Sequence, residues 1–223
     1  MTVDYAELRE GLVERLEWLG VIRTEKVKKA FLKVPRELFV LPSYRSEAYE
    51  DTPLPILEGQ TISAPHMCAI MCEALALNPG DRLLEIGTGS GYHIALCAEI
   101  IQGDKDASNG ILVTVEIYPK LAKFARENLE KAGYGALVNI VVADGSLGAP
   151  TRISFDKILV TAAAPEIPPS LIEQLNPGGR LVIPVGRFYQ DLKLVVKGAG
   201  GEMHIKSLGG CVFVPLKGEY GVK

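Results

Sequence analysis

From Asp81 to Pro184, short apolar runs alternate with longer segments whose apolar residues recur every three or four positions. The short runs predict β-strands, and the longer amphipathic segments predict helices. Strands are expected at residues 82–86, 111–116, 138–142, 155–160 and 180–184, and helices at residues 92–101, 119–131 and 168–175. Because strands that alternate with helices form a mostly parallel sheet, the expected fold class is α/β with a doubly wound sheet.

The two ends of the chain depart from this alternation. Helical spacing in the first part predicts an N-terminal helical cap, based on Leu8, Leu12, Leu16, Leu19, Val27, Ala30 and Phe31. Residues 191–197 and 203–216 have no long helix between them, which predicts antiparallel edge strands. We expect one domain, divided into a cap at 1–78 that includes a Thr-Ile-Ser segment, a ligand-binding core at 79–190 and edge strands at 191–223.

The strongest chemical signal follows the first strand of this core, where residues 85–92 read Glu-Ile-Gly-Thr-Gly-Ser-Gly-Tyr. Glycine at every second position lets the main chain approach a ligand closely. The spacing differs from the Gly-x-Gly-x-x-Gly fingerprint, which sets a pyrophosphate on a helix N-terminus. S-adenosylmethionine, which has no phosphate, fits better, because a helix N-terminus can hold its carboxylate. The alternative is a strand-to-helix turn in some other α/β protein.

Acidic residues follow the carboxyl ends of three predicted strands, where open α/β sheets bind their ligands. Glu116 can accept hydrogen bonds from both hydroxyls of a ribose, and Asp144 can accept one from an adenine amino group. Glu85 can order the glycine loop or contact the methionine ammonium. The alternatives are a solvated acid for Glu116 and a turn-forming Asp-Gly pair for Asp144.

Composition narrows the possibilities further. The chain has 223 residues, 48% of them hydrophobic, and a net charge of -3, which is typical of a globular protein with a sizeable core. There is no basic surplus for nucleic-acid binding and no apolar stretch of ~18 residues for a membrane span. We therefore expect a cytoplasmic protein with no nucleic-acid or membrane partner. A monomer is the expected state, although the sequence does not determine it.

Cysteine spacing gives no sign of a metal site. Cys68, Cys72, Cys97 and Cys211 form no Cys-x-x-Cys pair and no cysteine–histidine pattern at zinc spacing, so we expect no metal. Cys68 and Cys72 are interpreted as small buried apolar residues on one helix face. A disulfide would require an oxidising or hyperthermophilic setting.

Several segments spread over nearly the whole chain resemble the protein-L-isoaspartate O-methyltransferase family. The glycine loop is shared by many methyltransferases, whereas Thr-Ile-Ser-Ala-Pro-His-Met and Thr-Ala-Ala-Ala-Pro are specific to this family. The matching segments are residues 60–67, 85–92, 155–165, 178–186 and 213–216. Two features depart from the family pattern, namely Ala143 in place of glycine and a longer segment at residues 102–110.

The resemblance implies a Rossmann-like methyltransferase that transfers a methyl group from S-adenosylmethionine to the free carboxylate of L-isoaspartyl or D-aspartyl residues in damaged proteins. S-adenosylhomocysteine is released, and the ester closes to a succinimide that reopens partly to aspartate. Ser63 is then the active-site residue. The cofactor residues are Gln60, Thr61, Ile62, His66, Glu85, Gly87, Gly89, Ser90, Glu116, Ile117, Asp144 and Gly145, and the substrate residues are Ile62, Ser63, Val212, Phe213 and Val214.

The chemistry of the acceptor supports a positioning role for Ser63. A carboxyl with a pKa of about 4 is already ionised at neutral pH and needs no general base. Since no Ser-His-acid pattern surrounds Ser63, we expect its hydroxyl to orient the acceptor. His66 is expected to contact the cofactor or to cap main chain, His93 to lie at the surface, and His204 to be structural.

The sequence leaves alternatives open for two segments and for the function. Residues 161–165 form either a wall beside the reacting methyl group or a close helix–sheet contact, and residues 213–215 form either a peptide-binding edge or a core strand. The rival functions are another small-molecule or nucleic-acid methyltransferase, a non-catalytic S-adenosylmethionine-binding module and a nicotinamide dehydrogenase.

Overall fold

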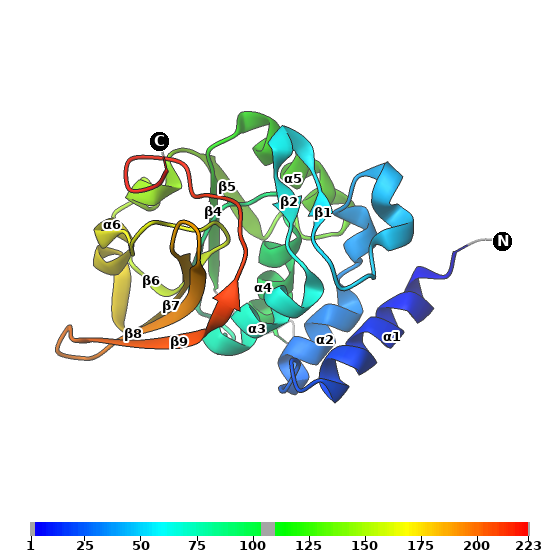
Figure 1. The fold of residues 1–223 in the computed structure, drawn as a ribbon, viewed down its shortest axis with the longest axis horizontal. Coiled ribbons are helices and arrows are strands. Elements are labelled where there is room, and N and C mark those ends of the chain that lie inside the picture. Colours follow the sequence, from blue (N-terminus) through cyan, green and yellow to red (C-terminus); the bar gives the residue numbers. More distant parts are fainter. Residues whose placement is uncertain (1–2, 104–109, 223) are drawn as a thin grey trace.

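The computed structural model describes residues 3–103 and 110–222, which form a central seven-stranded sheet flanked by helices (Figure 1). The strand order is β5-β4-β3-β6-β7-β8-β9, with parallel pairing from β5 to β7 and antiparallel pairing at β8 and β9. The strands are β3 (Arg82–Ile86), β4 (Ile111–Glu116), β5 (Val138–Val142), β6 (Phe155–Val160), β7 (Leu175–Val185), β8 (Gln190–Lys197) and β9 (Met203–Cys211). The predicted α/β fold class is confirmed.

Helices cover both faces of the sheet. Leu83 and Leu84 are consecutive in β3 and belong to two different core clusters, because successive strand residues point to opposite faces. The first cluster contains residues of α3 (Pro65–Leu75), α4 (Tyr92–Gln102) and α5 (Pro119–Lys131), and the second contains Leu171 of α6 (Pro169–Glu173). In the outer layer, α1 (Tyr5–Trp18) packs against α2 (Glu25–Lys33), which packs against α4 (Figure 1).

The segment between α2 and α3 is built from short elements. It contains η1 (Arg36–Leu38), η2 (Pro42–Glu47), β1 (Leu54–Pro55), η3 (Leu57–Gly59) and β2 (Thr61–Ile62), and η4 (Gly145–Leu147) follows β5. Strands β1 and β2 pair as a small antiparallel ladder, Leu54 opposite Ile62. This ladder brings the Thr-Ile-Ser segment to the start of α3.

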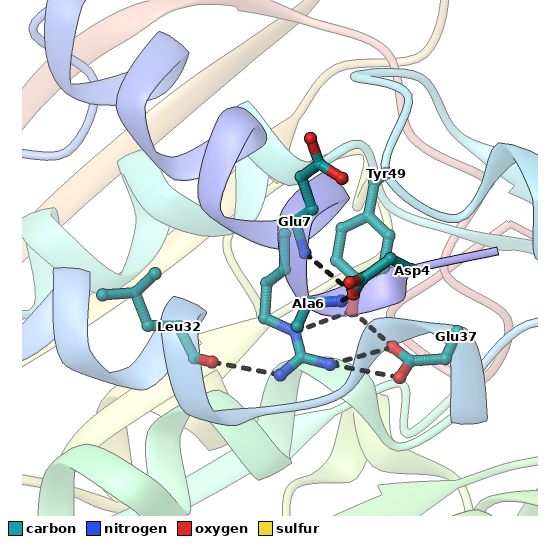
Figure 2. A network of polar contacts seen from close by, with 7 residues as sticks. Asp4, Ala6, Glu7, Leu32, Glu37 and Tyr49 are labelled. Atoms are coloured by element: carbon teal, nitrogen blue, oxygen red, sulfur yellow. Dashed lines mark hydrogen bonds and ion pairs between the residues drawn. The ribbon is translucent and has the colours of Figure 1, made fainter.

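A network around Arg9 joins the helical cap to this segment (Figure 2). Its guanidinium donates to the Tyr49 hydroxyl at 2.8 Å, to the carbonyl oxygen of Leu32 at 3.2 Å and to the Glu37 carboxylate at 3.1 and 3.3 Å. The Tyr49 hydroxyl also donates to Glu37. One side chain of α1 therefore holds α2, η1 and the following loop in a fixed arrangement.

The predicted apolar stripe of the first helix is only half correct. Leu12 and Leu16 are buried, but Leu8 and Leu19 are exposed. The buried face of the helix is formed by Leu12, Val13 and Leu16, so it is centred differently from the predicted stripe. In the second helix, by contrast, all three predicted residues, Val27, Ala30 and Phe31, are buried.

Two predicted boundaries near the C-terminus are wrong. The helix expected at 168–175 ends at Glu173, and β7 already begins at Leu175, which pairs with Phe155. The intervening Asn-Pro-Gly-Gly conceals the strand, because proline and glycine are poor strand residues. The last strand ends at Cys211, and residues 212–216 cross instead to Ala163, which bridges Pro215. Most of the expected surface loop at 102–110 lies outside the described residues.

The position of β3 prepares a binding site. From β3 the chain proceeds outward through β4 to β5, and then returns to β6 on the other side of β3. In open α/β sheets, ligands bind beyond the carboxyl ends of the strands at such a reversal. Within the described residues, no helix is long and apolar enough to span a membrane.

Candidate active site

A cavity opens beyond the carboxyl ends of β3 and β4, against the C-terminal segment. Seven of the predicted cofactor residues line it: Gln60, Thr61, Gly87, Gly89, Glu116, Ile117 and Gly145. Sequence analysis assigned no cofactor contact to several other lining residues, namely Val115, Tyr118, Leu121, Pro215, Leu216 and Lys217. Val115, Tyr118 and Leu121 are close to Glu116 in the sequence, so their presence could have been expected. Residues 215–217 are far away in the sequence and reach the cavity only through the tertiary fold.

The glycine loop forms the floor of this cavity. Gly87 has φ +94°, and a Cβ atom there would lie 2.4 Å from the Thr161 hydroxyl oxygen. That hydroxyl donates to the carbonyl oxygen of Gly87 at 2.6 Å. A side chain at position 87 would therefore collide with Thr161 in a backbone conformation that L-residues rarely adopt.

Glu116 holds the loop through its main chain. One carboxylate oxygen accepts from the N–H of Gly89 at 3.0 Å, and the other accepts from the N–H of Tyr118 at 3.0 Å. Each oxygen retains a further lone pair for a ligand hydroxyl. The predicted ribose-binding carboxylate is thus fixed in place at the wall of the cavity.

Glu85 lies buried beneath the loop. It accepts a hydrogen bond from the Thr114 hydroxyl at 2.6 Å, and Thr114 is bonded to Thr88 at 2.7 Å. Its other oxygen has no partner among the described residues. Burial raises the pKa of Glu85 to about 8. This placement favours loop ordering over ligand contact for Glu85.

Asp144 uses both carboxylate oxygens on the protein itself. One accepts from the N–H and hydroxyl of Ser146 at 2.9 and 2.7 Å, and the other accepts from the N–H of Glu219 at 2.8 Å. The neighbouring Gly145, rather than Asp144, is among the residues that line the cavity. Asp144 therefore forms the turn after β5 and tethers the C-terminal segment to it, in agreement with the turn-forming alternative.

A second cavity of about 280 Å³ adjoins the first, with Thr61, Thr161 and Val214 in both walls. It is lined by the catalytic candidate Ser63 together with His66 and Val212. The Nδ1 atom of His66 lies 3.0 Å from a carboxylate oxygen of Asp51. His66 therefore lines the cavity of Ser63 and not the first cavity. Ile62 and Ser90 line a smaller space between the two.

A buried arginine holds the Ser63 segment. Arg36 donates to the carbonyl oxygen of Ser63 at 2.8 Å and to that of Ala48 at 2.9 Å, and its guanidinium lies 4.7 Å from the centre of the Tyr92 ring. Tyr92 begins α4 directly after the glycine loop. Arg36 thus connects the two segments of the site. Sequence reasoning missed it, because a single arginine in an irregular segment carries no recognisable pattern.

The C-terminal segment forms the far wall of the second cavity. The Gln190 side chain accepts from the N–H of Phe213 at 2.6 Å and donates to its carbonyl oxygen at 3.0 Å. The carbonyl oxygen of Val214 accepts from the N–H of Ala163 at 2.8 Å. Val212, between this segment and β9, is 94% exposed, and its main chain has no hydrogen-bond partner among the described residues.

The histidines outside the Ser63 cavity differ in placement. His204 lies exposed on β9, in the expected edge hairpin. His93, predicted at the surface, is buried, because the first turn of α4 is enclosed between the sheet and the neighbouring helices. Its Nε2 atom lies 3.5 Å from the sulfur of Cys72.

Comparison with known proteins gives a consistent result. The family model described as Protein-L-isoaspartate(D-aspartate) O-methyltransferase (PCMT) matches residues 7–221. The protein-L-isoaspartate O-methyltransferase of Hyperthermus butylicus is 53% identical, covering 97% of this chain and 91% of its own length. The corresponding protein of Methanopyrus kandleri is 54% identical, covering 97% of this chain and 94% of its own.

Solved structures agree with these relatives. A Plasmodium falciparum structure titled as a β-aspartate methyltransferase in complex with S-adenosyl-L-homocysteine has a TM-score of 0.84 at 28% identity, and the match covers 97% of this chain and 99% of that one. A second structure, titled protein-L-isoaspartate O-methyltransferase, also has a TM-score of 0.84, at 33% identity, with 96% of this chain and 67% of that chain covered.

Proposed function

The chain belongs to the protein-L-isoaspartate(D-aspartate) O-methyltransferase family, and on this premise we propose that its two adjoining cavities separate the methyl donor from the acceptor. The enzyme transfers a methyl group from S-adenosylmethionine to the free carboxylate of isoaspartyl residues in proteins. The main support for two separate binding sites is that Thr61 and Thr161 line both cavities. The cavity that contains Ser63 therefore lies directly beside the cavity that contains Glu116.

The residues of the first cavity fit S-adenosylmethionine. The loop at Gly87 and Gly89 leaves the main chain open where Cβ atoms would otherwise stand, and Glu116 presents fixed carboxylate oxygens for a ribose. Gly145 is assigned to the adenine end, and the N-terminus of α4, where Tyr92 and His93 line the adjoining smaller space, suits a carboxylate. When bound, the cofactor supplies an electrophilic methyl group on its sulfonium.

The second cavity holds the acceptor carboxylate, and Ser63 orients it. The carboxylate is ionised at neutral pH and acts as the nucleophile without a general base. Because the Ser63 hydroxyl has no hydrogen-bond partner among the described residues, it is available to donate to the substrate. Correct placement of reacting groups contributes as much as ~7–11 kcal/mol to catalysis.

The enzyme recognises the substrate peptide through hydrogen bonds to the peptide main chain. Gln190 engages both main-chain polar groups of Phe213, and Ala163 engages the carbonyl oxygen of Val214. Val212, in contrast, is exposed, and its main chain has no partner among the described residues. An extended peptide that pairs with Val212 is held independently of its side chains, which allows many sequences to be accepted. The proposal includes a monomeric enzyme, and the net charge of -3 supports the expectation that it has no nucleic-acid partner.

The test compares wild type with Ser63→Ala and Ser63→Thr, using labelled S-adenosylmethionine and an isoaspartyl peptide. Its aspartyl twin and an RNA serve as negative substrates. We expect base-labile label on the isoaspartyl peptide alone, and a loss in kcat of ~10²-fold or more in Ser63→Ala from the missing donor. Ser63→Thr keeps a hydroxyl and should retain more activity. Full turnover of Ser63→Ala at saturating peptide would refute the orienting role.

A further inference from the structure

Beneath the active site, three potential metal ligands from two helices meet in the protein interior. Cys72 of α3 and His93 and Cys97 of α4 are all buried, and their ligating atoms lie within 4.8 Å of one another. The sulfur of Cys72 is 3.5 Å from Nε2 of His93. For a tetrahedral zinc with Zn–S of about 2.3 Å and Zn–N of about 2.0 Å, the sulfur and nitrogen are separated by about 3.5 Å.

The spacing of these residues supplies a fourth ligand. Cys68 and Cys72 are four residues apart on α3, and His93 and Cys97 are four residues apart on α4, so each pair shares one face of its helix. The Cys68 sulfur itself lies 4.0 Å from the carbonyl oxygen of Ser63, one turn of α3 from Cys72. The ligating atoms of Cys72, His93 and Cys97 already lie around a common point, and Cys68, one turn before Cys72 on α3, would complete the set by turning its side chain toward them.

We propose that Cys68, Cys72, His93 and Cys97 bind a structural zinc ion. Three cysteines and one histidine form a closed tetrahedral set, which is typical of structural rather than catalytic zinc. The thiols bind as thiolates, and their protons pass to solvent as the metal enters. The linear sequence does not reveal the site, because its two ligand pairs are separated by the whole of β3 and the glycine loop.

Two unpartnered buried atoms support this site. His93 Nδ1 and Glu85 Oε1 are both buried and lack a hydrogen-bond partner among the described residues. Metal binding at Nε2 fixes the imidazole proton on Nδ1, and the usual acceptor for that proton is a carboxylate or a carbonyl oxygen. The unpartnered Glu85 Oε1 is the acceptor that we assign to this proton, although the two atoms are not hydrogen-bonded to each other in this structure.

The site also has an approach route and a structural purpose. A small space of about 30 Å³, lined among others by Ser63, Cys68 and His93, connects the cluster to the active-site side. Helix α3 begins just after Ser63, and α4 begins just after the glycine loop. A zinc ion between them fixes the acceptor segment relative to the cofactor loop.

The experiment measures metal in the full-length protein, purified with thiols reduced from zinc-supplemented cells. We expect about one zinc per chain by elemental analysis. Cys72→Ser and Cys97→Ser should lose it, whereas Cys211→Ser, which alters the cysteine outside the cluster, should keep it. Removal of zinc by a chelator should lower Tm by roughly 10 °C, and added zinc should restore it.

Cobalt provides a test that does not depend on the variants folding. Zinc-stripped wild type given Co²⁺ should develop thiolate-to-cobalt charge-transfer bands and the intense visible bands of tetrahedral cobalt. Absence of zinc from the wild type together with absence of these bands would overturn the proposal. So would a mass deficit of two hydrogens that maps to a Cys72–Cys97 disulfide in metal-free protein.

Discussion

At the scale of single residues, the geometry of the glycine loop requires that Gly87 has no side chain. Gly87 adopts φ +94° and lies against Thr161, whose hydroxyl and N–H both bind the end of β3. The loop is thereby held against β6, with its main chain turned toward the first cavity. Thr161 thus acts as a packing partner of the glycine loop as well as a wall of both cavities.

Gly87→Ala should consequently cost more than backbone strain alone. Gly80→Ala is the matched control, because Gly80 has φ +83° but a Cβ atom there would meet nothing within 4 Å beyond its chain neighbours. We expect about 1 kcal/mol of destabilisation from strain in Gly80→Ala and about 2–4 kcal/mol in Gly87→Ala, where overpacking against Thr161 is added. Urea unfolding measures both.

Cofactor affinity provides a second readout for the same pair of variants. Gly87→Ala should weaken binding of S-adenosylhomocysteine by more than ~10-fold, equivalent to about 1.4 kcal/mol, while Gly80→Ala should leave it unchanged. Adding Thr161→Ala to Gly87→Ala should recover the overpacking part of the stability loss. Equal stability of the two alanine variants would show that the contact with Thr161 has no energetic effect.

At the scale of elements, one side chain aligns the proposed peptide-binding edge. Gln190 opens β8 and takes both main-chain groups of Phe213, extending the sheet's hydrogen bonding beyond the end of β9. The exposed main chain of Val212 is therefore held between two anchored residues, Cys211, which pairs with Gln190, and Phe213. The edge is presented in an extended form before substrate arrives.

Gln190→Ala should raise KM for the isoaspartyl peptide with little change in kcat. Two hydrogen bonds of about 1 kcal/mol each are lost, so we expect an increase in KM of up to roughly 30-fold. Gln190→Glu keeps the acceptor for the Phe213 N–H but loses the donor to its carbonyl oxygen, and should fall between. Steady-state kinetics with saturating S-adenosylmethionine measures both values. An unchanged KM in Gln190→Ala would contradict pre-alignment of this edge.

Much of the order and extent of the helices and strands was predictable from sequence, because the spacing of apolar residues shows which side chains are buried. Strands β3, β4, β5 and β6 have the predicted bounds, and the glycine loop and Glu116 lie where the strand ends place them. The prediction failed where long-range contacts decide, as with buried His93 and the segment at Pro215. The role of Arg36 and the meeting of Cys72 with Cys97 likewise depend on helix packing that local spacing does not specify.

At the scale of the whole molecule, the helical cap and the sheet share one core. The first core cluster runs without a break from Leu12 and Phe31 in the cap through Leu96 in α4 to Leu83 in the sheet. Within residues 1–78, Arg36 of η1 donates to the carbonyl oxygen of Ser63, and Arg9 of α1 donates to Glu37 of η1. We infer that residues 1–78 are no independent unit and that the chain unfolds as a single domain.

Arg9→Ala tests this inference, because it weakens the cap without touching the sheet. The guanidinium is partly buried and binds Tyr49, Leu32 and Glu37, so its removal should destabilise the protein by roughly 2 kcal/mol and lower Tm by roughly 4–8 °C. Arg9→Lys, which keeps the charge but not the planar fork, should be affected less. In calorimetry, both variants should show one transition whose calorimetric and van't Hoff enthalpies agree. A second, earlier transition in Arg9→Ala would mean that the cap unfolds separately, and hydrogen exchange confined to α1 and α2 would then identify it.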